Sequence, residues 1–443
     1  PLVTGVQTCA LPISRLELSR LYARFSFGPR PGEFNQALKE GFTSTAQYIL
    51  DISSRNSKDV VVQNPNVDDV GVRPSPSNIS ATKTFNTLVK NQNDNLVLWW
   101  LDRMALTNNP FLERMIWFWH GHWATSIEKV NFALPMFNQL QTIRATALGN
   151  FQEMALQMFR DGALQIWLDG NDNVKGAPNE NLSREFMELF TVGVNNYTED
   201  DVKSLAKAFT GFQVNRTTGV ISFNPTRHFT DPITFFDSKI NSDPVEAINV
   251  LTARPDNSYF IATRLWFRFI SSNLEIDKKF GIQEAYRNRD ISSTMKALVM
   301  NGALSVPEHT IVRQPVEWFI AICRAFSLQP SKLIPRTLSI SYLSKLAQVP
   351  FYPPNVGGWP TDEAWLSAAS AQFRIAFASA LAKQVDLSPI AAIEPLKRVS
   401  YIKDLLGIFN FSSRTFTALT NAKDDLPQFF TLVVCSPEFI VNA

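Results

Sequence analysis

Apolar residues recur at spacings of three and four along almost the whole chain, and this period constrains the fold more than any other feature. The segment SRLELSRLYARF places its apolar side chains on one helical face and stops at the Gly/Pro breaker FGPRPG. Similar patterns continue to the C-terminus, including a long one over about residues 81–107. Only residues 211–236 alternate as strands do, with a turn at Arg216–Gly219. The sequence therefore predicts an all-α fold with one small β hairpin.

The length of the chain predicts one large helical domain over residues 15–443. A chain of 443 residues, 45% of them hydrophobic, can bury a large core, and no period of 20–50 residues repeats along it. Residues 53–79 are rich in Pro, Asn and Ser, which predicts a long loop. Residues 3–14, VTGVQTCALPIS, match the in-frame translation of a sequencing adapter. We therefore expect residues 1–14 to be foreign to the natural protein, whose own N-terminus would lie outside this sequence.

Charge and hydropathy argue against two classes of partner. Lys and Arg total 42 against 40 for Asp and Glu, so the net charge is +2, and no dense basic run favours nucleic acid. No apolar stretch approaches the roughly 18 residues that a membrane span needs. Three cysteines without a CxxC motif do not form a disulfide framework. The sequence predicts a protein without nucleic-acid partners or membrane spans.

The stretch WFWHGHWATS contains two of the four histidines, His120 and His122. We expect a helix to end at Gly121 in the left-handed conformation, with His122 just beyond it. Alternate residues of an extended segment face the same way, so the pair can offer two imidazoles to one metal ion. The alternative is that both imidazoles cap helix carbonyls and pack among the neighbouring tryptophans.

A second concentration of polar residues, WLDGNDNVKGAPNENLSREFMELFTVGVNNYT, covers residues 167–198. Its helix has a buried stripe of Leu182, Phe186, Leu189 and Phe190. The opposite face carries Glu180, Arg184 and Glu188, with Asn181 and Glu185 at the margin. One interpretation is a solvated ladder in which Arg184 bridges two glutamates.

The functional interpretation of this segment is a polar site at a helix start, where function often concentrates. The catalytic candidates are then Glu185, Glu188 and Arg184. The preceding loop supplies substrate-binding candidates, which are Lys175, Asn179 and Asn181.

The stretch PPNVGGWP at residues 353–360 combines two prolines, two glycines and Trp359. It predicts a rigid turn in which the tryptophan is a structural wedge. Alternatively, an exposed Trp359 is a substrate-binding platform on which a sugar or another ring stacks.

With these motifs in view, the chain resembles a bacterial family, domain of unknown function 1800 (DUF1800). The resemblance covers nearly everything after residue 14 and rests on HGHWATS and PNENLSREFMELFTVG together with RLWFRFI, RQPVEWF and FYPPNVGGWP. It implies an all-helical, secreted or periplasmic protein encoded beside a sulfatase-like partner, and no established activity. The chain departs from the family pattern at Arg20, where many members have His, and at HFTDPITFF.

Three functions fit these residues. The first is a metal-dependent enzyme in which His120 and His122 bind Zn, Fe or Mn, with Glu185 or Glu188 as a further ligand and Arg184 holding an anionic or polar substrate. The second is a non-catalytic binding or assembly protein that acts with the sulfatase-like partner. The third is a metal-free enzyme that uses paired carboxylates on glycans. In the first case, the His-x-His and Asn-Glu-Asn motifs should meet across one polar cleft.

Overall fold

The computed structural model describes residues 12–53, 59–60 and 62–442. Most of the adapter-like segment lies outside the described residues. The first half of the chain contains α1 (Pro12–Phe25), α2 (Glu33–Glu40), α3 (Phe42–Leu50), α5 (Ile79–Leu106), α6 (Pro110–His122), α7 (Ile127–Val130), α8 (Ala133–Thr146), α9 (Phe151–Phe159), α10 (Gly162–Trp167), η1 (Gly170–Asp172), α11 (Asn181–Glu185), η2 (Phe186–Thr191) and α12 (Glu199–Ala208).

The second half contains η3 (Pro225–Arg227), α13 (Pro244–Ala253), α14 (Pro255–Phe269), η4 (Lys278–Phe280), α15 (Ile282–Ala285), α16 (Ile291–Met300), η5 (Ala303–Ser305), α17 (Pro315–Ala325), η6 (Pro330–Lys332), α18 (Leu338–Lys345), η7 (Asp362–Trp365), α19 (Ala368–Leu381), α20 (Ser388–Ala391), η8 (Pro395–Lys397), α21 (Arg398–Leu405), α22 (Ser413–Ala422), α23 (Leu426–Val434) and α24 (Pro437–Ile440). The structure is 60% helical, which confirms the predicted fold class.

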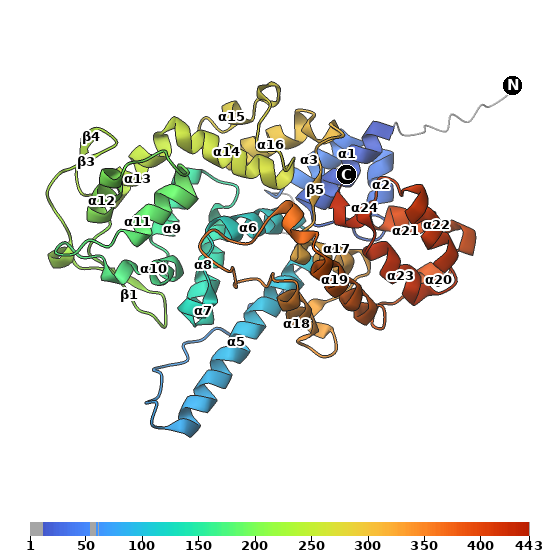
Figure 1. Ribbon diagram of the computed structural model, residues 1–443, viewed down its shortest axis with the longest axis horizontal. Helices are drawn as coiled ribbons and strands as arrows, with labels where there is room; N and C mark the ends of the chain where they lie inside the picture. Colours follow the sequence, from blue (N-terminus) through green and yellow to red (C-terminus); the bar gives the residue numbers. More distant parts are fainter. Residues whose placement is uncertain (1–11, 54–58, 61, 443) are drawn as a thin grey trace.

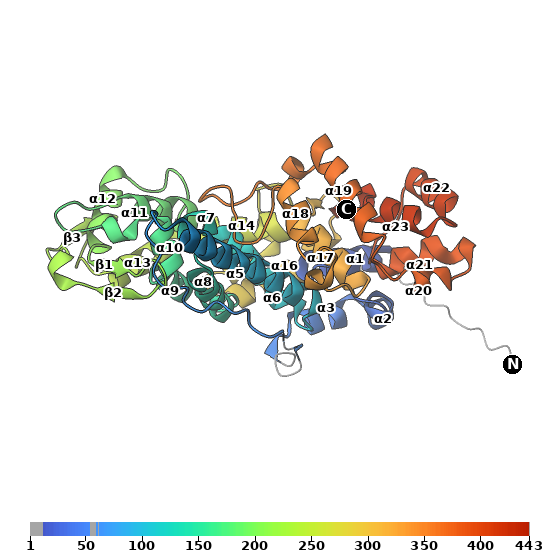
Figure 2. The same ribbon diagram turned by 90° about the horizontal axis from the view of Figure 1, so that it is seen from below.

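The helices form an elongated body (Figure 1). Helices α9–α13 and the hairpins lie at one end and α20–α23 at the other, with α6, α14 and α17 between them. Helix α5 projects from this body, and a quarter turn of the view shows it foreshortened and running obliquely (Figure 2). Within the described residues, no helix is both long enough and apolar enough to cross a membrane.

The strands form more than the single hairpin predicted at residues 211–236. They are β1 (Phe212–Val214), β2 (Ile221–Phe223), β3 (Ile233–Phe235), β4 (Ser238–Ile240), β5 (Ile311–Val312) and β6 (Val441–Asn442). They form three two-stranded antiparallel sheets, β1–β2, β3–β4 and β5–β6. The first is the expected hairpin, and β3–β4 is a second one. Phe236 and Asp237 turn the second hairpin with positive φ angles of 46° and 61°. Such a turn usually carries Asn-Gly, so the sequence signal was missing.

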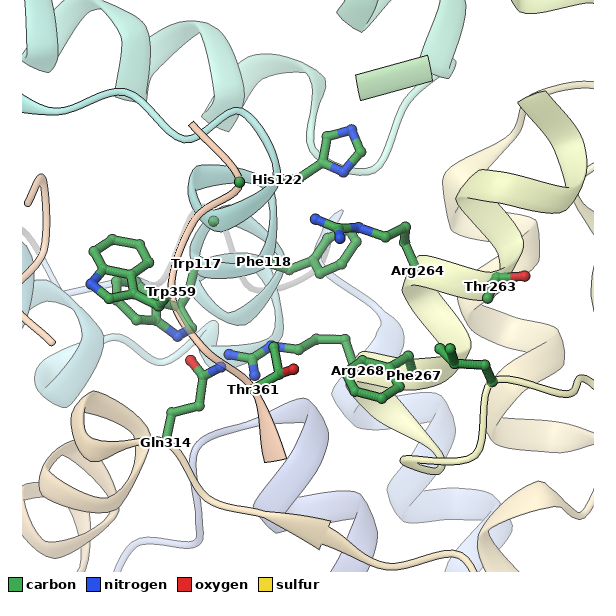
Figure 3. Close-up of a pocket in the computed structure, with 13 residues that line it drawn as sticks. Trp117, Phe118, His122, Thr263, Arg264, Phe267, Arg268, Gln314, Trp359 and Thr361 are labelled. Carbon is green, nitrogen blue, oxygen red and sulfur yellow. The ribbon is translucent and has the colours of Figure 1, made fainter. Parts of the chain in front are cut away.

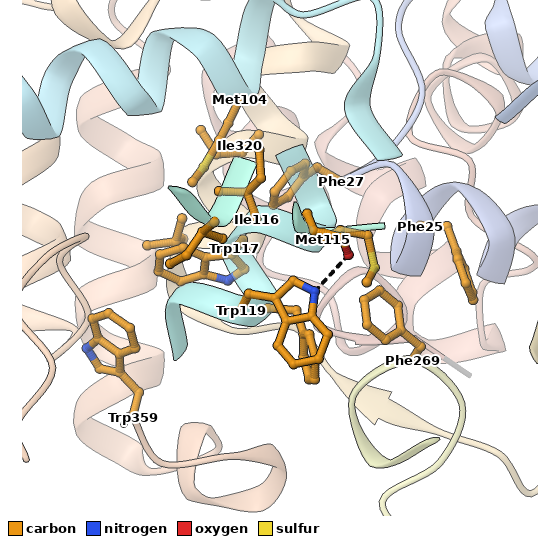
Figure 4. Close-up of a cluster of buried hydrophobic side chains, with 14 of the residues drawn as sticks. Phe25, Phe27, Met104, Met115, Ile116, Trp117, Trp119, Phe269, Ile320 and Trp359 are labelled. Carbon is orange, nitrogen blue, oxygen red and sulfur yellow. Dashed lines mark hydrogen bonds between the residues drawn. The ribbon is translucent and has the colours of Figure 1, made fainter. Parts of the chain in front are cut away.

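Helix α6 lies at the centre of the fold because it is buried on almost every side. Pro110 occupies its first turn, where a missing N–H costs nothing. Eleven of its 13 residues are buried, and a helix covered on all sides belongs inside a core. Figure 4 shows Met115, Ile116, Trp117 and Trp119 of α6 among buried side chains from other helices. The Nε1–H of Trp119 donates a hydrogen bond to the carbonyl of Ala147.

Candidate functional site

The His-x-His pair lies at the C-terminal end of α6, inside the protein. His120 is 1% exposed and His122 is 2% exposed. The prediction that Gly121 ends the helix was wrong, because α6 continues through His122 and the N–H of Trp123 still bonds back into its last turn. Residues two apart in a helix point about 200° away from each other. The two imidazoles therefore leave α6 on different sides, whereas the metal-site interpretation needed them on the same side.

His120 is held as a neutral hydrogen-bond acceptor. Its Nε2 accepts the backbone N–H of Phe351 at 3.0 Å. Its ring lies 4.9 Å from the ring of Trp100, 5.1 Å from that of Phe351 and 5.5 Å from that of Trp359, measured between centroids. Burial lowers the pKa of His120 to about 3, so the imidazole is uncharged at neutral pH. The Nε2 lone pair is thus already used by the fold.

His122 has one nitrogen bonded and one without a partner. Its Nε2 lies 2.9 Å from the carbonyl oxygen of Phe190. Because a carbonyl can only accept, Nε2 carries the proton and Nδ1 keeps a bare lone pair. Nδ1 is buried and has no hydrogen-bond partner among the described residues. Burial, and then the positive charge of Arg264, hold the pKa of His122 well below its usual value.

A cavity of about 280 Å³ opens beside His122, between the end of α6 and helix α14 (Figure 3). The side chains come from four separate parts of the chain, which the fold brings together around it. They are Trp117, Phe118, Gly121, His122, Thr263, Arg264, Phe267, Arg268, Leu274, Gln314, Gly357, Trp359 and Thr361. We call this cavity the α6–α14 pocket.

Helix α14 contributes two arginines to the pocket, Arg264 and Arg268, one helical turn apart. Arg268 donates to Glu317 at 2.5 Å. Arg264 has no hydrogen bond or ion pair with any residue that the structure describes. Its guanidinium carbon lies over the ring of Phe260, 5.9 Å from the ring centroid. Burial lowers the pKa of Arg264. Its guanidinium is therefore a half-buried cation that the described residues leave unpaired, next to His122 (Figure 3).

Charge around the pocket is predominantly positive. Glu317 is the carboxylate bonded to Arg268, and it also accepts from Arg114 at 2.5 Å. Burial by itself would raise the pKa of Glu317, but these two arginines hold it below its usual value. Burial lowers the pKa of Arg268 to about 10, and the charges of Arg114 and Arg264 add to that effect. One carboxylate is thus shared between two arginines while Arg264 stays uncompensated.

Gln314 presents a hydrogen-bond donor at the same pocket. The backbone N–H of Val316 bonds to Oε1 of Gln348, which leaves the Nε2 of Gln348 to donate to Oε1 of Gln314 at 2.7 Å. The amide oxygen of Gln314 is therefore occupied. Its Nε2 has no hydrogen-bond partner within the described ranges, so the free end of this side chain is a donor.

The loop that carries Trp359 closes one side of the pocket. Trp359 stacks on Trp117 with ring centroids 5.3 Å apart and is only 8% exposed. It is therefore a buried wall of the pocket rather than the exposed platform considered from the sequence. Gly358 has a φ of +87°, and a Cβ built there would lie 2.6 Å from the carbonyl oxygen of Gly121. The second glycine of PPNVGGWP is thus needed for the close approach of this loop to α6.

The acidic helix, residues 181–191 (α11 and η2), differs from the pocket because its charged side chains have partners. Arg184 pairs with Glu180 at 3.1 Å and with Glu199 of α12 at 2.7 Å. Glu188 accepts a hydrogen bond from the hydroxyl of Tyr197 instead of reaching Arg184. Glu185 is half-buried, and burial followed by the charge of Glu188 raises its pKa. The ladder interpretation therefore holds for one of the two expected glutamates, and the second partner of Arg184 comes from another helix.

The predicted substrate-binding residues Lys175, Asn179 and Asn181 make hydrogen bonds to nearby backbone groups. The side-chain oxygen of Asn179 caps the N–H of Asn181, whose Nδ2 donates to the carbonyl of Leu168 at 3.2 Å. The backbone N–H of Lys175 donates to the carbonyl of Arg227, and its side chain is exposed. None of these residues lines the α6–α14 pocket.

The two sequence motifs do meet, but across aromatic side chains. Besides the bond from His122, Trp123 contacts Phe190 and Phe186 with centroids 4.8 and 5.7 Å apart. Residues 186–191 form a π-helical turn, a form that often accompanies functional sites. Within residues 12–53, 59–60 and 62–442, no three His, Cys, Asp or Glu side chains are placed to hold one metal ion.

Sequence reasoning missed Arg264, Arg268 and Gln314. A signal was present, since TRLWFRF spaces two arginines four apart in an otherwise apolar helix. Charges on an apolar face are normally paired when buried. That pattern marks Arg264 and Arg268 as candidates, but it does not say which of them finds a carboxylate.

Comparison with known families agrees with the motifs of this site. Residues 20–441 match the model of the family described as "Protein of unknown function (DUF1800)". The chain belongs to this family. The match includes α6, α14, Gln314 and the Trp359 loop, so the whole α6–α14 pocket lies within the family region. No curated protein and no solved structure matches this DUF1800 chain.

Proposed function

We propose that this protein binds a small anionic ligand in the α6–α14 pocket. The observation that carries the proposal is the guanidinium of Arg264, which lines the pocket without a hydrogen bond or ion pair to any described residue. An unpaired cation that is half-buried in a cavity has lost part of its hydration, and a bound anion is one way to compensate that loss. An anion between Arg264 and Arg268 would offset that loss.

The remaining polar groups of the pocket favour the same ligand. Gln314 presents an amide donor, and the indole Nε1–H groups of Trp117 and Trp359 are buried without partners among the described residues. Donors thus outnumber acceptors, which suits the acceptor-rich oxygens of a carboxylate or phosphate.

Size and shape restrict the ligand further. The cavity of about 280 Å³ is slightly smaller than the range of about 300–1,000 Å³ usual for small-molecule pockets. Phe118, Phe267 and the stacked pair Trp117 and Trp359 give it apolar walls. The proposed ligand is therefore compact, with a charged end and a carbon skeleton.

Calorimetric titration with sodium acetate and with inorganic phosphate tests the proposal. We expect saturable binding of at least one anion by the wild-type protein. Arg264→Met should weaken that binding about 10- to 100-fold, the range expected for losing a charge-assisted hydrogen bond.

Arg287→Met is the matched control, because it removes the same charge from an exposed arginine that pairs with Glu284 outside the pocket. It should leave binding unchanged. Equal loss in both variants would mean that only net charge matters. Absence of saturable binding to the wild-type protein would refute the proposal.

The metal-dependent enzyme expected from the sequence stays a prediction. The two imidazoles do not favour a shared metal ion, since Nε2 of His120 accepts from Phe351 and Nε2 of His122 holds its proton for Phe190. Mass spectrometry of the purified protein beside a His120→Ala/His122→Ala double variant tests it. Stoichiometric Zn, Fe or Mn that disappears in the variant would establish the metal site.

The other sequence-based functions are also predictions. A carboxylate enzyme on glycans would rely on a pair among Glu180, Glu185 and Glu188, all of which lie outside the α6–α14 pocket. A binding protein that acts with a sulfatase-like partner in the periplasm or outside the cell is compatible with an anion-binding pocket. Co-purification of the two proteins would test that partnership.

A further inference from the structure

Among the side chains that line the α6–α14 pocket, His122 differs from its neighbours because its Nδ1 can only accept, whereas the hydroxyls of Thr263 and Thr361 can also donate. The bond from its Nε2–H to the carbonyl of Phe190 leaves Nδ1 with a lone pair that no described residue uses. The Phe190 carbonyl is held in place by the π-helical turn of residues 186–191. The bond to Phe190, which lies outside the pocket, therefore fixes the orientation of the imidazole and which of its nitrogens carries the proton.

The neighbours of Nδ1 are donors. The guanidinium of Arg264 lies next to the ring of His122 (Figure 3), and its charge acts on that ring. Protonating Nδ1 would bury a second cation beside Arg264, and burial, followed by the charge of Arg264, accordingly lowers the pKa of His122. At neutral pH the pocket therefore combines the guanidinium groups of Arg264 and Arg268 with an uncharged nitrogen that can only accept.

We propose that the ligand of the α6–α14 pocket is a hydroxy-anion, whose hydroxyl group donates to Nδ1 of His122 while its anionic group binds Arg264 and Arg268. The proposal rests on the anion-binding function proposed above. It adds the second group that the ligand must carry.

Alternative donors fit less well than a hydroxyl group. An ammonium group beside Arg264 would be repelled, so an amino acid is disfavoured although it also carries a donor next to a carboxylate. A ligand without a donor would leave Nδ1 buried and unsatisfied, which costs binding free energy. A hydroxyl is neutral, small enough for the cavity and can turn its proton toward the acceptor.

Matched small anions test this specificity. Propionate, the two enantiomers of lactate, and L-alanine have the same carbon skeleton and differ at one position, where they carry H, OH or NH₃⁺. Ethyl phosphate and 2-hydroxyethyl phosphate form the corresponding phosphate pair. We expect calorimetry to show one lactate enantiomer, or 2-hydroxyethyl phosphate, binding about 3- to 10-fold more tightly than its unhydroxylated partner. L-Alanine should bind more weakly than propionate.

Two isosteric variants assign the preference to Nδ1. Leu and Asn have the same branched shape, and both lose the bond to Phe190, but only Asn places an acceptor near the position of Nδ1. His122→Leu should bind hydroxylated and unhydroxylated anions equally, and His122→Asn should keep part of the preference. Circular dichroism and melting curves of both variants establish that they are folded.

The outcomes separate this inference from the proposed function. Equal affinity of the wild-type protein for the hydroxylated and unhydroxylated members of both the carboxylate set and the phosphate pair would overturn the hydroxy-anion inference and leave the anion site standing. A preference that survives in His122→Leu would also overturn it. Binding of none of these anions would remove the anion site itself, and the inference with it.

Discussion

The α6–α14 pocket and the acidic helix at residues 181–191 both contain arginine and other polar side chains, which are paired in the helix and partly unpaired in the pocket. Arg184 is half-buried and has two carboxylate partners, and Glu188 has a hydroxyl partner. Arg264 is unpaired within the described residues, and His122 has a free acceptor. The region with fewer acidic and basic residues in sequence is therefore the one with an unpaired charged side chain. Unsatisfied groups in a cavity are a better guide to binding than the density of charged residues.

The largest expected effect contrasts packing in the two regions. His120→Ala should lower the free energy of unfolding by about 3 kcal/mol, because it empties a space between aromatic rings and leaves the N–H of Phe351 buried without an acceptor. Arg184→Ala should lower it by less than about 1 kcal/mol, as is usual for exposed ion pairs. Urea unfolding of both variants measures the difference. Equal losses of unfolding free energy would show that buried packing at His120 does not contribute more than the ion pairs of Arg184.

The pH dependence of stability should have opposite signs in the two regions. The pKa of His120 is about 3 in the folded protein and 6.5 as its ordinary value, so its contribution is full above pH 6.5 and is lost as the pH falls. Between pH 6.5 and 5 this loss is about 2 kcal/mol, at about 1.4 kcal/mol per pH unit. The raised pKa of Glu185 acts the other way, because it contributes stability at low pH that is lost as the pH rises.

Unfolding curves of His120→Gln and Glu185→Gln across pH 4–7 test this expectation. Relative to the wild-type protein, the first variant should gain stability as the pH falls and the second should lose it. Parallel curves for all three proteins would contradict the assignment.

The unpaired charge should cost stability when no ligand is bound. Arg264→Met keeps most of the apolar stem and removes a half-buried, unpaired guanidinium, so we expect the free energy of unfolding to rise by less than about 1 kcal/mol. Arg184→Met removes paired charges and should lower it by a few tenths of a kcal/mol. Thermal unfolding in an anion-poor buffer checks both signs. A clear loss of stability in Arg264→Met would indicate that this arginine supports the fold.

The smallest expected effect comes from two glycines with open space around them. An added Cβ meets nothing within 4 Å at Gly121, in the pocket, or at Gly176, in the loop before the acidic helix. Each change to alanine should raise the free energy of unfolding by less than about 1 kcal/mol. Only Gly121→Ala narrows the pocket, so only that variant should bind acetate or phosphate more weakly in calorimetry. Weaker binding by Gly176→Ala would place the anion site elsewhere.

Local sequence by itself determined the helical class and much of the element order. The period of apolar residues and Pro110 at the start of α6 both act over a few residues, and each was interpreted correctly. Gly121 was misjudged for a physical reason. Glycine closes a helix only where the chain needs a left-handed residue, and here the helix continues inside the core.

Only the tertiary structure decided which of these polar groups are candidates for function. Arg184 found its second partner, Glu199, on a neighbouring helix, and Glu317 came to Arg268 from 49 positions along the chain. Arg264 lies one turn before Arg268 and has no such partner among the described residues. The sequence does state that a charge is present. Whether that charge is paired depends on side chains that are distant in sequence, and their positions follow from how the helices pack.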